Sequence, residues 1–375
     1  MSDVRQLDGP PERERDTAFM RRALALAREG WGQTAPNPLV GAVVVRDDRI
    51  VGEGFHPRYG AAHAEVNALR AAGDAARGAT LYVTLEPCAH EGKTPPCADA
   101  VIAAGVSRVV IAVRDPSPVA RGGLERMREA GVHVTVGVER NEALEVNAPF
   151  FNAHGTDRPW VTLKLALSAE GAIADADRRR RWLSGPESRR EVHRMRAAAD
   201  AIAVGLGTVI ADDPMLTVRD VAAPRMAPVR VVFDAALGIP AAAAVVRTAR
   251  DVPTVVVARE ADERRSTLLR EAGVDVLIAS SAGDALRQLY RRGIRALLVE
   301  GGASLAGALL NDYLVDRLVI FQTPVRLGEG ALPAFGCVSA EVRREIAGAP
   351  LIERRVLGDD VMTTAALHPI PCSPD

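Results

Sequence analysis

Residues 84–97 read Thr-Leu-Glu-Pro-Cys-Ala-His-Glu-Gly-Lys-Thr-Pro-Pro-Cys, and residues 62–66 read Ala-His-Ala-Glu-Val. Together they offer one imidazole, that of His63, and two thiols, those of Cys88 and Cys97, each near the expected start of a helix. Zinc prefers tetrahedral nitrogen and sulfur ligands, and a catalytic site keeps its fourth position for water. A helix N-terminus carries partial positive charge, which favours the thiolate that a metal needs. We therefore predict that these three side chains converge on one zinc ion.

Glu65 lies two residues after His63, and its carboxylate is better placed for proton transfer than for metal binding. It can accept the proton of an activated water and pass it to a leaving amine, which is general acid–base catalysis. His-x-Glu followed by Pro-Cys-x-x-Cys is typical of zinc deaminases. Here the second cysteine follows the first by nine positions instead of three. The longer spacing favours a distinct subfamily over a generic nucleotide or tRNA deaminase.

Helices and strands alternate around these motifs. Residue patterns predict helices at 16–28, 62–72, 97–104 and 124–130, and strands at 39–45, 50–55, 80–85, 109–113 and 132–136. Residues 46–49 have turn composition, so the first two strands are expected to form a hairpin. The order predicts an α/β domain over residues 16–146, with a mostly parallel, helix-covered sheet.

A second α/β domain follows an aperiodic stretch. Residues 147–158 carry Pro, Gly, His and Asp, so we place a linker there and a second domain at 159–367. We expect helices at 186–199, 284–291 and 304–310, and strands at 160–166, 201–204, 229–233, 254–258, 274–278, 296–299, 318–323 and 362–367.

Two glycine-containing turns of this second domain come directly after strands. Residues 299–304, Val-Glu-Gly-Gly-Ala-Ser, precede a helix, where backbone N–H groups and the glycines let an anion come close. This turn is a candidate phosphate cradle, and residues 205–208, Gly-Leu-Gly-Thr, have a similar pattern. The Gly-x-Gly-x-x-Gly fingerprint of dinucleotide-binding domains is absent from the 299–304 turn.

Composition and charge exclude several classes of protein. The 375 residues are 48% hydrophobic and 25% charged, which is ordinary for a globular chain long enough for two domains. A formal net charge of −1 argues against nucleic-acid binding and against a polybasic membrane anchor. No apolar run reaches the about 18 residues of a transmembrane helix, and residues 1–15 do not resemble a secretory signal. Four cysteines are too few for a disulfide scaffold. We expect a cytoplasmic protein in which Cys337 and Cys372 are inert.

Only two of the 47 Lys and Arg residues are lysines, Lys93 and Lys164. Lysine is a compact ammonium that can lose its proton, whereas arginine is a permanently charged planar fork. Either these two lysines remain by chance, or both lie where a point charge or a titratable amine is needed.

Residues 87–97, Pro-Cys-Ala-His-Glu-Gly-Lys-Thr-Pro-Pro-Cys, closely resemble the deaminase half of the bacterial bifunctional riboflavin-biosynthesis deaminase/reductases, the RibD family. Residues 37–44, Asn-Pro-Leu-Val-Gly-Ala-Val-Val, and residues 63–66 match the same family. The resemblance implies a cytidine-deaminase-like α/β/α fold, in which Glu65 moves protons beside a zinc ion. It also implies a pyrimidine-nucleotide pocket lined by Asn37, His56, His90 and Lys93, with Lys93 near an anionic, phosphorylated substrate.

The likeness continues through the second domain. Residues 162–166, 207–219 and 299–303 resemble the first strand, the pocket loop and the nucleotide-binding turn of the family's reductase, which has a dihydrofolate-reductase-like α/β fold and uses NADPH. The resemblance places Lys164 near the reacting sugar carbon. It implies a cofactor side formed by Leu167, Trp182, Thr208, Asp212 and the turn that runs from Gly302 through Ala303 and Ser304 to Ala308. It implies a substrate side formed by Arg196, Leu216, Arg219 and Glu300, whose two guanidiniums suit a ribose phosphate.

Two segments depart from the family pattern. Residues 168–172 are Ser-Ala-Glu-Gly-Ala, where the family usually has Ser-Leu-Asp-Gly-Lys. Residues 178–181 are four arginines, where a serine-containing stretch is usual. We interpret the arginine run as a solvated loop rather than as an extra phosphate grip. The departures leave open both the efficiency of the reductase and a contact by Arg180.

The resemblance predicts a bifunctional enzyme that acts on a small pyrimidine ribosyl phosphate. The first domain would hydrolyse the 2-amino group of 2,5-diamino-6-ribosylamino-4(3H)-pyrimidinone 5′-phosphate, and the second would reduce the ribosyl group to ribityl with NADPH. Two alternatives stay open: a nucleotide or tRNA zinc deaminase with a non-catalytic C-terminal binding domain, and a non-catalytic scaffold stabilised by zinc. A fourth protein ligand, such as His90, would favour the scaffold, since structural zinc sites usually have four. The oligomeric state stays open, a homo-oligomer included.

Overall fold

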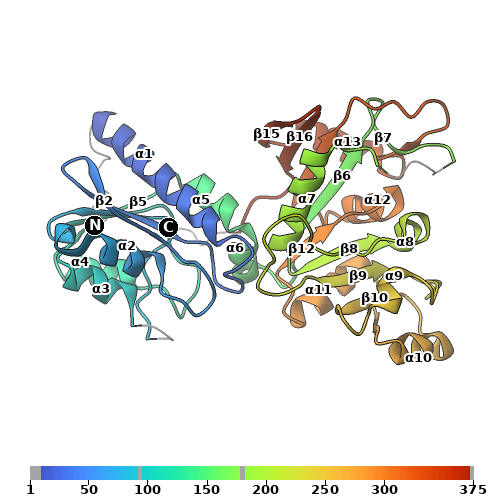
Figure 1. The fold of residues 1–375 in the computed structure, drawn as a ribbon, viewed down its shortest axis with the longest axis horizontal. Coiled ribbons are helices and arrows are strands. Elements are labelled where there is room, and N and C mark those ends of the chain that lie inside the picture. The colour runs from blue at the N-terminus through green and yellow to red at the C-terminus, as the bar shows by residue number, and fades with distance from the viewer. Residues whose placement is uncertain (1–9, 92–94, 178–181, 372–375) are drawn as a thin grey trace. The chain divides into compact units, whose positions relative to one another are not determined.

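The chain folds into two compact units that divide after Gly155 (Figure 1). The computed structural model describes residues 10–91, 95–177 and 182–371. The first unit ends at Gly155 and also includes Ile370 and Pro371, whereas the second runs from Thr156 to Pro369. The predictions for Lys93, for the four arginines at 178–181 and for Cys372 lie outside the described residues.

The first unit is a five-stranded sheet with helices on both faces. Its strand order is β2-β1-β3-β4-β5, with β3, β4 and β5 parallel and β1 antiparallel to both β2 and β3. The elements are α1 (Pro10–Ala27), β1 (Gly41–Arg46), β2 (Arg49–Phe55), α2 (Ala64–Ala72), β3 (Thr80–Val83), α3 (Cys97–Ala103), β4 (Arg108–Ile111), α4 (Gly123–Glu129), β5 (His133–Val136), α5 (Arg140–Val146) and α6 (Ala148–Gly155).

The expectation of a mostly parallel first sheet holds only for β3 to β5. The turn between β1 and β2 is made by Asp47 and Asp48, whose φ angles are 49° and 57°. Two consecutive left-handed residues make the tight turn that joins antiparallel strands. The chain then crosses through α2 and places β3 on the other side of β1, so that β1 is antiparallel to both neighbours.

Alternate residues of β1 face two different helical layers. Ala42 and Val44 pack with residues of α2, α3 and α4, whereas Val43 and Val45 pack with residues of α1, α5 and α6. Because both faces are covered, β1 is a continuous run of buried apolar residues rather than an alternating one. This layering puts α2 and α3, which begin at the predicted metal ligands, on the same face of the sheet.

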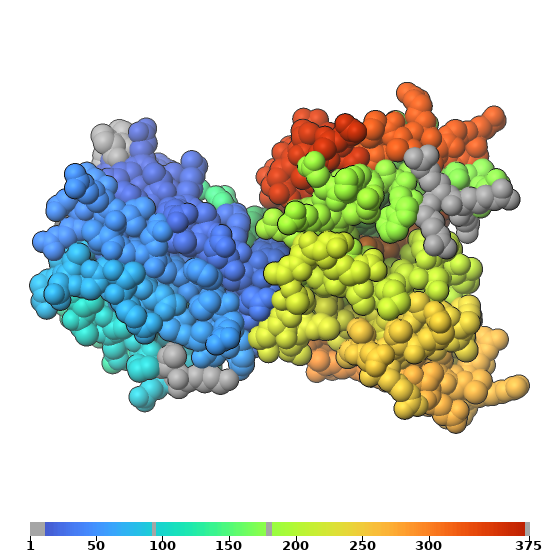
Figure 2. Space-filling model, viewed as in Figure 1, coloured from blue at the N-terminus to red at the C-terminus, as the bar shows by residue number. Residues whose placement is uncertain are grey.

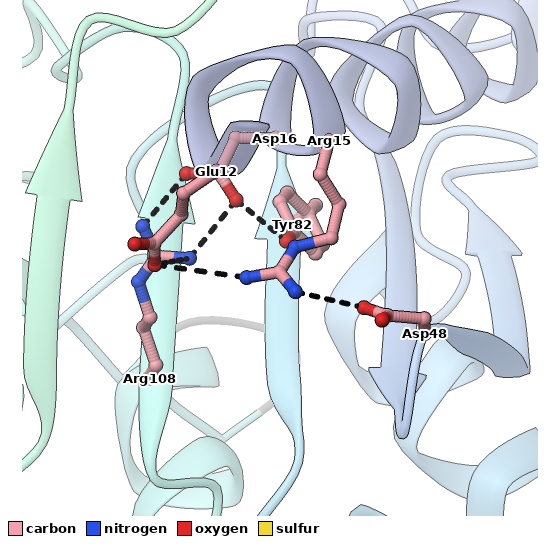
Figure 3. A network of polar contacts seen from close by, with 6 residues as sticks. All are labelled: Glu12, Arg15, Asp16, Asp48, Tyr82 and Arg108. Carbon is pink, nitrogen blue, oxygen red and sulfur yellow. Dashed lines mark hydrogen bonds and ion pairs between the residues drawn. The ribbon is translucent and has the colours of Figure 1, made fainter. Parts of the chain in front are cut away.

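Helix α1 lies on the face of the sheet opposite to α2, and a buried ion pair holds it to the strands (Figure 3). The carboxylate of Asp16 accepts hydrogen bonds from Nη1 and Nη2 of Arg108, at 2.9 and 2.7 Å, and from the Tyr82 hydroxyl at 2.7 Å. Burial and this hydrogen bond raise the pKa of Tyr82. Glu12 lies 3.7 Å from both Arg15 and Arg108 and extends the network toward the surface. These groups join α1 to β3 and β4.

The second unit is built on a nine-stranded sheet of order β11-β10-β9-β8-β12-β6-β13-β16-β15. The strands from β11 to β13 are parallel, and β16 and β15 are antiparallel. Figure 2 shows green, yellow and red segments of this unit, far apart in the sequence, meeting on one face. Among the described residues no helix is long and apolar enough to cross a membrane.

The elements of this unit follow each other mostly as strand and helix. They are β6 (Trp160–Leu167), β7 (Ala172–Ala174), α7 (Pro186–Ala198), β8 (Ala201–Gly205), α8 (Leu206–Asp212), β9 (Val229–Phe233), α9 (Ala244–Arg247), β10 (Thr254–Ala258), α10 (Glu263–Glu271), β11 (Asp275–Ile278), α11 (Ala282–Arg291), β12 (Ala296–Val299), α12 (Ala303–Asn311), β13 (Arg317–Gln322), β14 (Leu332–Pro333), α13 (Ala340–Gly348), β15 (Leu351–Leu357) and β16 (Asp360–Ala366). Strands β7 and β14 pair separately as a two-stranded sheet.

The order of the parallel strands reverses between β8 and β12. From β8 the chain moves outward through β9, β10 and β11, and it then returns to place β12 on the other side of β8. In open α/β sheets, ligands bind outside the carboxyl ends of the strands at such a reversal. Helix α8 starts immediately after β8, and α12 starts shortly after β12, so the topology brings both helix starts to this edge.

The stretch predicted as a linker, residues 147–158, is largely helical. Residues 148–155 form α6, which places Phe151 in the core of the first unit. Its sequence lacks an amphipathic pattern, and its proline stands in the first turn, where a helix tolerates it. Elements α10, α13 and β15 were also not expected, because few of their residues are buried and charged residues are frequent in them.

Candidate metal centre and strand-end cavity

Close packing of α2 on β2 sets the position of the first functional helix. A Cβ on Gly54 would come within 2.4 Å of the Ala68 nitrogen, so glycine is required for this approach. The amide of Asn67 donates to the carbonyls of Phe55 and Ala62, at 2.9 and 3.3 Å, and ties the preceding loop to the helix. These contacts fix the start of α2, where the motif of residues 62–66 lies.

The three predicted metal ligands come together. One nitrogen or sulfur atom from each lies within 4.8 Å of the others. Nδ1 of His63 is 3.2 Å from Sγ of Cys97 and 3.7 Å from Sγ of Cys88. His63 caps α2, Cys97 begins α3, and Cys88 lies in the loop after β3. Both cysteines are buried free thiols rather than a disulfide.

The donor set fits zinc with an open position. One imidazole and two thiols are the ligand types that zinc prefers, and three protein ligands are usual where a fourth position serves catalysis. Within the described ranges, no further His, Cys, Asp or Glu joins the cluster. His90 is therefore outside the ligand set, and its buried Nδ1 has no hydrogen-bond partner among the described atoms. This arrangement is not the four-ligand set of a structural site.

The protein atoms alone favour one thiolate in this cluster. The hydrogen bond from the Cys97 thiol lowers the pKa of Cys88, and His63 contributes in the same direction. The same sulfur–sulfur hydrogen bond, together with burial, raises the pKa of Cys97. The hydrogen bond with Cys88 also raises the pKa of His63. Cys88 is thus prepared as an anionic ligand.

Glu65 is buried beside the cluster, in the first turn of α2. Its residue is only 3% exposed, and burial raises the pKa of its carboxyl to about 7. The nearby His63 acts in the opposite direction. A carboxyl group with a pKa near neutrality can both accept and release a proton during turnover. Position and acidity therefore match the proton transfer expected of this residue.

His56 uses both of its ring nitrogens within the protein. Its Nδ1 lies 3.2 Å from the Ala62 carbonyl, which can only accept, so Nδ1 carries the proton. Its Nε2 then accepts from the Asn37 amide at 3.2 Å. Burial lowers the pKa of His56, in agreement with a neutral ring, and that ring packs edge-on against His63 at 5.3 Å. His56 therefore orients Asn37 and does not itself offer a free nitrogen to a substrate.

The second unit contains a cavity of about 1330 Å³ at the carboxyl ends of its parallel strands. This volume exceeds the about 300–1,000 Å³ of a typical single-ligand pocket, so it is larger than one small ligand requires. Most residues expected on the cofactor and substrate sides line it: Lys164, Trp182, Arg196, Thr208, Asp212, Leu216, Arg219, Glu300, Gly302, Ala303, Ser304 and Ala308.

Leu167 is the exception among these predictions. It is absent from the cavity wall, and its side chain is buried in the hydrophobic core together with Leu163 and Leu165. Successive side chains of a strand point to opposite faces, and these three residues share one face of β6. Leu165, on the same face of β6, does line the cavity, so the cofactor contact predicted for Leu167 stays a prediction.

The turn at residues 300–302 suits an anionic ligand at the start of α12. Gly302 caps this nine-residue helix, and a Cβ at Gly302 would lie 3.6 Å from the hydroxyl of Thr208. That distance is an ordinary van der Waals contact, so Gly302 and Thr208 lie next to each other on the cavity wall. Helix N-terminal N–H groups bind phosphate and pyrophosphate. The residues present fit the pyrophosphate of a nicotinamide dinucleotide.

Charges converge at the centre of the cavity. Arg196 forms a bidentate pair with Glu300, at 2.6 and 2.9 Å, and its third hydrogen bond goes to the Thr217 carbonyl at 2.9 Å. Although burial opposes ionisation, Arg196 holds the pKa of Glu300 below its usual value. Burial lowers the pKa of Lys164, while Glu300 acts in the opposite direction. Arg196 therefore spends three of its five donors inside the protein, and the phosphate grip expected of Arg196 and Arg219 stays a prediction.

His193 lines the same cavity and was not expected from the sequence. Its Nδ1 accepts the backbone N–H of Arg219 at 3.1 Å and so ties α7 to the loop that carries Leu216. Leu216 has a φ of 48°, a left-handed conformation that is rare for leucine and often marks a functional site. The available signal was helical spacing, since His193 precedes Arg196 by three residues and shares its face of α7.

Each half of the chain matches a known protein family. The family described as the cytidine and deoxycytidylate deaminase zinc-binding region matches residues 13–113, and the RibD C-terminal domain matches residues 159–353. The riboflavin biosynthesis protein RibD of Aquifex aeolicus is 45% identical over 85% of this chain and 89% of its own length. That of Escherichia coli is 40% identical over 92% of this chain and 98% of its own length.

Solved structures give the same result. Acinetobacter baumannii RibD matches with a TM-score of 0.79 at 35% identity, over 94% of this chain and 99% of its own. A diaminohydroxyphosphoribosylaminopyrimidine deaminase/5-amino-6-(5-phosphoribosylamino)uracil reductase from Thermotoga maritima matches with a TM-score of 0.81 at 34% identity, over 95% and 99% of the two chains.

Proposed function

This chain belongs to the RibD family of bifunctional riboflavin-biosynthesis enzymes, and we propose which of its residues serve each reaction. It is a zinc-dependent deaminase of 2,5-diamino-6-ribosylamino-4(3H)-pyrimidinone 5′-phosphate and an NADPH-dependent reductase that converts the ribosyl group to ribityl. The two alternatives, a tRNA or nucleotide deaminase with an inactive second domain and a non-catalytic zinc scaffold, are wrong. The first unit carries the deamination, and the second carries the reduction.

His63, Cys88 and Cys97 would hold the zinc ion. Bound zinc supplies a Lewis acid that makes a water molecule acidic near neutral pH. Glu65 accepts a proton from the attacking water and delivers it to the amino group that leaves as ammonia. Asn37, oriented by His56, contacts the pyrimidine, and His90, whose Nδ1 has no partner within the described part of the chain, contacts the same ligand. Lys93 remains a sequence-based proposal for the substrate phosphate.

The observation that carries this assignment is the convergence of three ligand atoms within 4.8 Å next to the buried Glu65. An E65Q variant tests it, because glutamine keeps the shape of the side chain but cannot take up a proton. We expect E65Q to retain one zinc per chain and to lose ammonia release by about 10²–10⁴-fold, the usual contribution of general acid–base catalysis. Full deamination by E65Q would exclude the proposed proton transfer.

In the second unit, Lys164 and the Arg196–Glu300 pair would surround the ribosyl group. NADPH supplies the hydride that adds to the sugar carbon C1′. The ring oxygen gains a proton when its bond to C1′ opens, and the Lys164 ammonium, held near Glu300, can donate that proton. Arg219 and the turn at Gly302 would bind the phosphate groups of substrate and cofactor. Trp182, Thr208 and Asp212 would complete the cofactor side.

The partners follow from the same assignment. We propose that the protein acts on small pyrimidine ribosyl phosphates and does not bind nucleic acid, in line with its formal net charge of −1. A cytoplasmic location and a homo-oligomeric state stay predictions. Supplying the deaminated product with NADPH would test the reductase by itself, since its oxidation of NADPH should not require the first unit's metal.

A further inference from the structure

Cys88 differs from the other two proposed metal ligands in how its backbone is held. His63 caps α2 and Cys97 is the first residue of α3, so a helix positions each of them. Cys88 lies between β3 and α3, in a segment that is neither helix nor strand. Something other than regular secondary structure must therefore keep its sulfur in place.

Glu86 connects this segment to the loop after β4. Its side chain is fully buried, and its carboxylate accepts hydrogen bonds from three backbone N–H groups, those of Asp115 at 3.2 Å, Gly122 at 3.0 Å and Leu124 at 3.2 Å. The guanidinium of Arg114 lies 3.5 Å away. One carboxylate thus gathers the loop after β4 and the start of α4 around itself.

The same loop presses directly on the residues beside Cys88. A Cβ on Gly123 would lie 1.7 Å from the Pro87 carbonyl oxygen, so only glycine permits the approach. The Ala89 nitrogen donates to the Ala120 carbonyl at 3.0 Å. Residues on both sides of Cys88 are therefore fixed to the segment that Glu86 organises.

On its other side, Cys88 meets the start of α3. Its carbonyl accepts the Ala98 N–H at 3.1 Å, and its sulfur accepts the Cys97 N–H at 3.4 Å. These contacts set the orientation of Cys88 relative to Cys97 only if the segment from 86 to 89 stays against α3. The loop from 114 to 124, held by Glu86, forms the wall behind it.

We propose that Glu86 is a positioning residue of the metal centre, which fixes the Cys88 sulfur through the loop from 114 to 124. The inference rests on the proposed ligands His63, Cys88 and Cys97. Groups outside the ligand set that orient metal ligands typically change metal affinity by about 10–100-fold when they are removed. Loss of the Glu86 carboxylate leaves three N–H groups without their acceptor and frees both the loop and Cys88.

The test compares E86Q and E86A with D16N in the full-length protein. Asp16 is a matched control, because it is a buried carboxylate of the same unit that binds Arg108 and Tyr82 on the other layer of the sheet. Zinc affinity is measured by chelator competition, and cobalt(II) replaces zinc to report thiolate coordination by visible absorption. We expect zinc to bind about 10–100-fold more weakly to E86A, with an altered cobalt spectrum, and E86Q, which keeps one acceptor oxygen, to fall between E86A and wild type. D16N should lower the melting temperature but leave metal affinity and spectrum unchanged.

A second variant keeps the test decisive if the Glu86 variants fail to fold. G123A leaves every carboxylate in place and pushes directly on the Pro87 carbonyl, so it should also alter the cobalt spectrum. Zinc affinity within twofold of wild type and an unchanged spectrum in E86A, or in G123A when E86A does not fold, would overturn the role of Glu86. A wild-type protein that binds no zinc would instead overturn the ligand assignment itself.

Discussion

The metal centre and the strand-end cavity are built in opposite ways. The metal centre needs three side chains of fixed chemical type, whose ligand atoms converge within 4.8 Å. The cavity spans about 1330 Å³, and its wall draws on β6, α7, the pocket loop, the end of β12 and α12. A metal site uses few residue types, so the spacing of its ligands can be recognised in the sequence. A cavity formed by the order of the strands accepts many side chains and has no such spacing. The two sites should therefore respond separately to perturbation.

Removal of the metal should produce the largest difference between the sites. We expect dialysis against a chelator to abolish ammonia release, because the remaining residues lack a Lewis acid to activate water. NADPH oxidation with the deaminated substrate should persist, and zinc should restore ammonia release. Parallel loss of both activities would show that the metal also supports the second unit, and circular dichroism before and after dialysis would detect such unfolding.

Breaking the ion pair in the cavity should impair reduction and leave deamination unchanged, and its effect should be smaller than that of metal removal. E300Q removes the bidentate partner of Arg196 and leaves the charges of Arg196 and Lys164 without compensation. We expect kcat/KM of the reductase to fall by about 10–100-fold, as buried charge pairs of about 1.4–3 kcal/mol predict, with no change in deamination. E263Q, which alters an exposed carboxylate of the same unit, is the control. Reductase kinetics within twofold of wild type would remove this pair from the substrate side.

The lowered pKa of Lys164 should give the reductase an alkaline pH dependence of its own, which changes its rate by a few-fold. Because burial lowers its pKa from 10.5, Lys164 loses its proton at a lower pH than an exposed lysine does. The proposed proton donor is the charged form, so the reductase rate should decline on the alkaline side before pH 10.5. K164R stays charged over this range and should lack that decline, whatever its absolute rate. If wild type and K164R showed the same decline of NADPH oxidation at alkaline pH, the decline would belong to another group.

Much of the fold could be predicted because buried elements leave clear patterns. β1 appeared as a continuous apolar run, since both of its faces are covered, and the alanine-rich stretch 62–72 indicated helix α2. Helix α6 and the exposed edge strand β15 were missed, because neither carries an amphipathic or alternating pattern. The hairpin was expected from turn composition, but the antiparallel placement of β1 between β2 and β3 depends on a crossover that local sequence does not encode.

The candidate sites show the same division. His63, Cys88, Cys97 and Glu65 were identified from residue type and spacing, and most residues of the cavity were identified through resemblance. Neither route indicated that His56 turns both ring nitrogens inward or that Leu167 faces the core. Glu86 and His193 were overlooked because their partners are backbone groups. Every residue has these groups, so they leave no pattern of residue types in the sequence.

The sequence by itself determined which atoms could bind a metal, since thiol, imidazole and carboxyl chemistry belong to individual residues. Tertiary structure alone decided which of them meet, how strongly burial shifts the pKa of Glu65, and which arginine of the cavity pairs with a carboxylate. The physical reason is that acidity and hydrogen-bond availability depend on neighbours and on the exclusion of water, and both are set by chain segments far apart in the sequence.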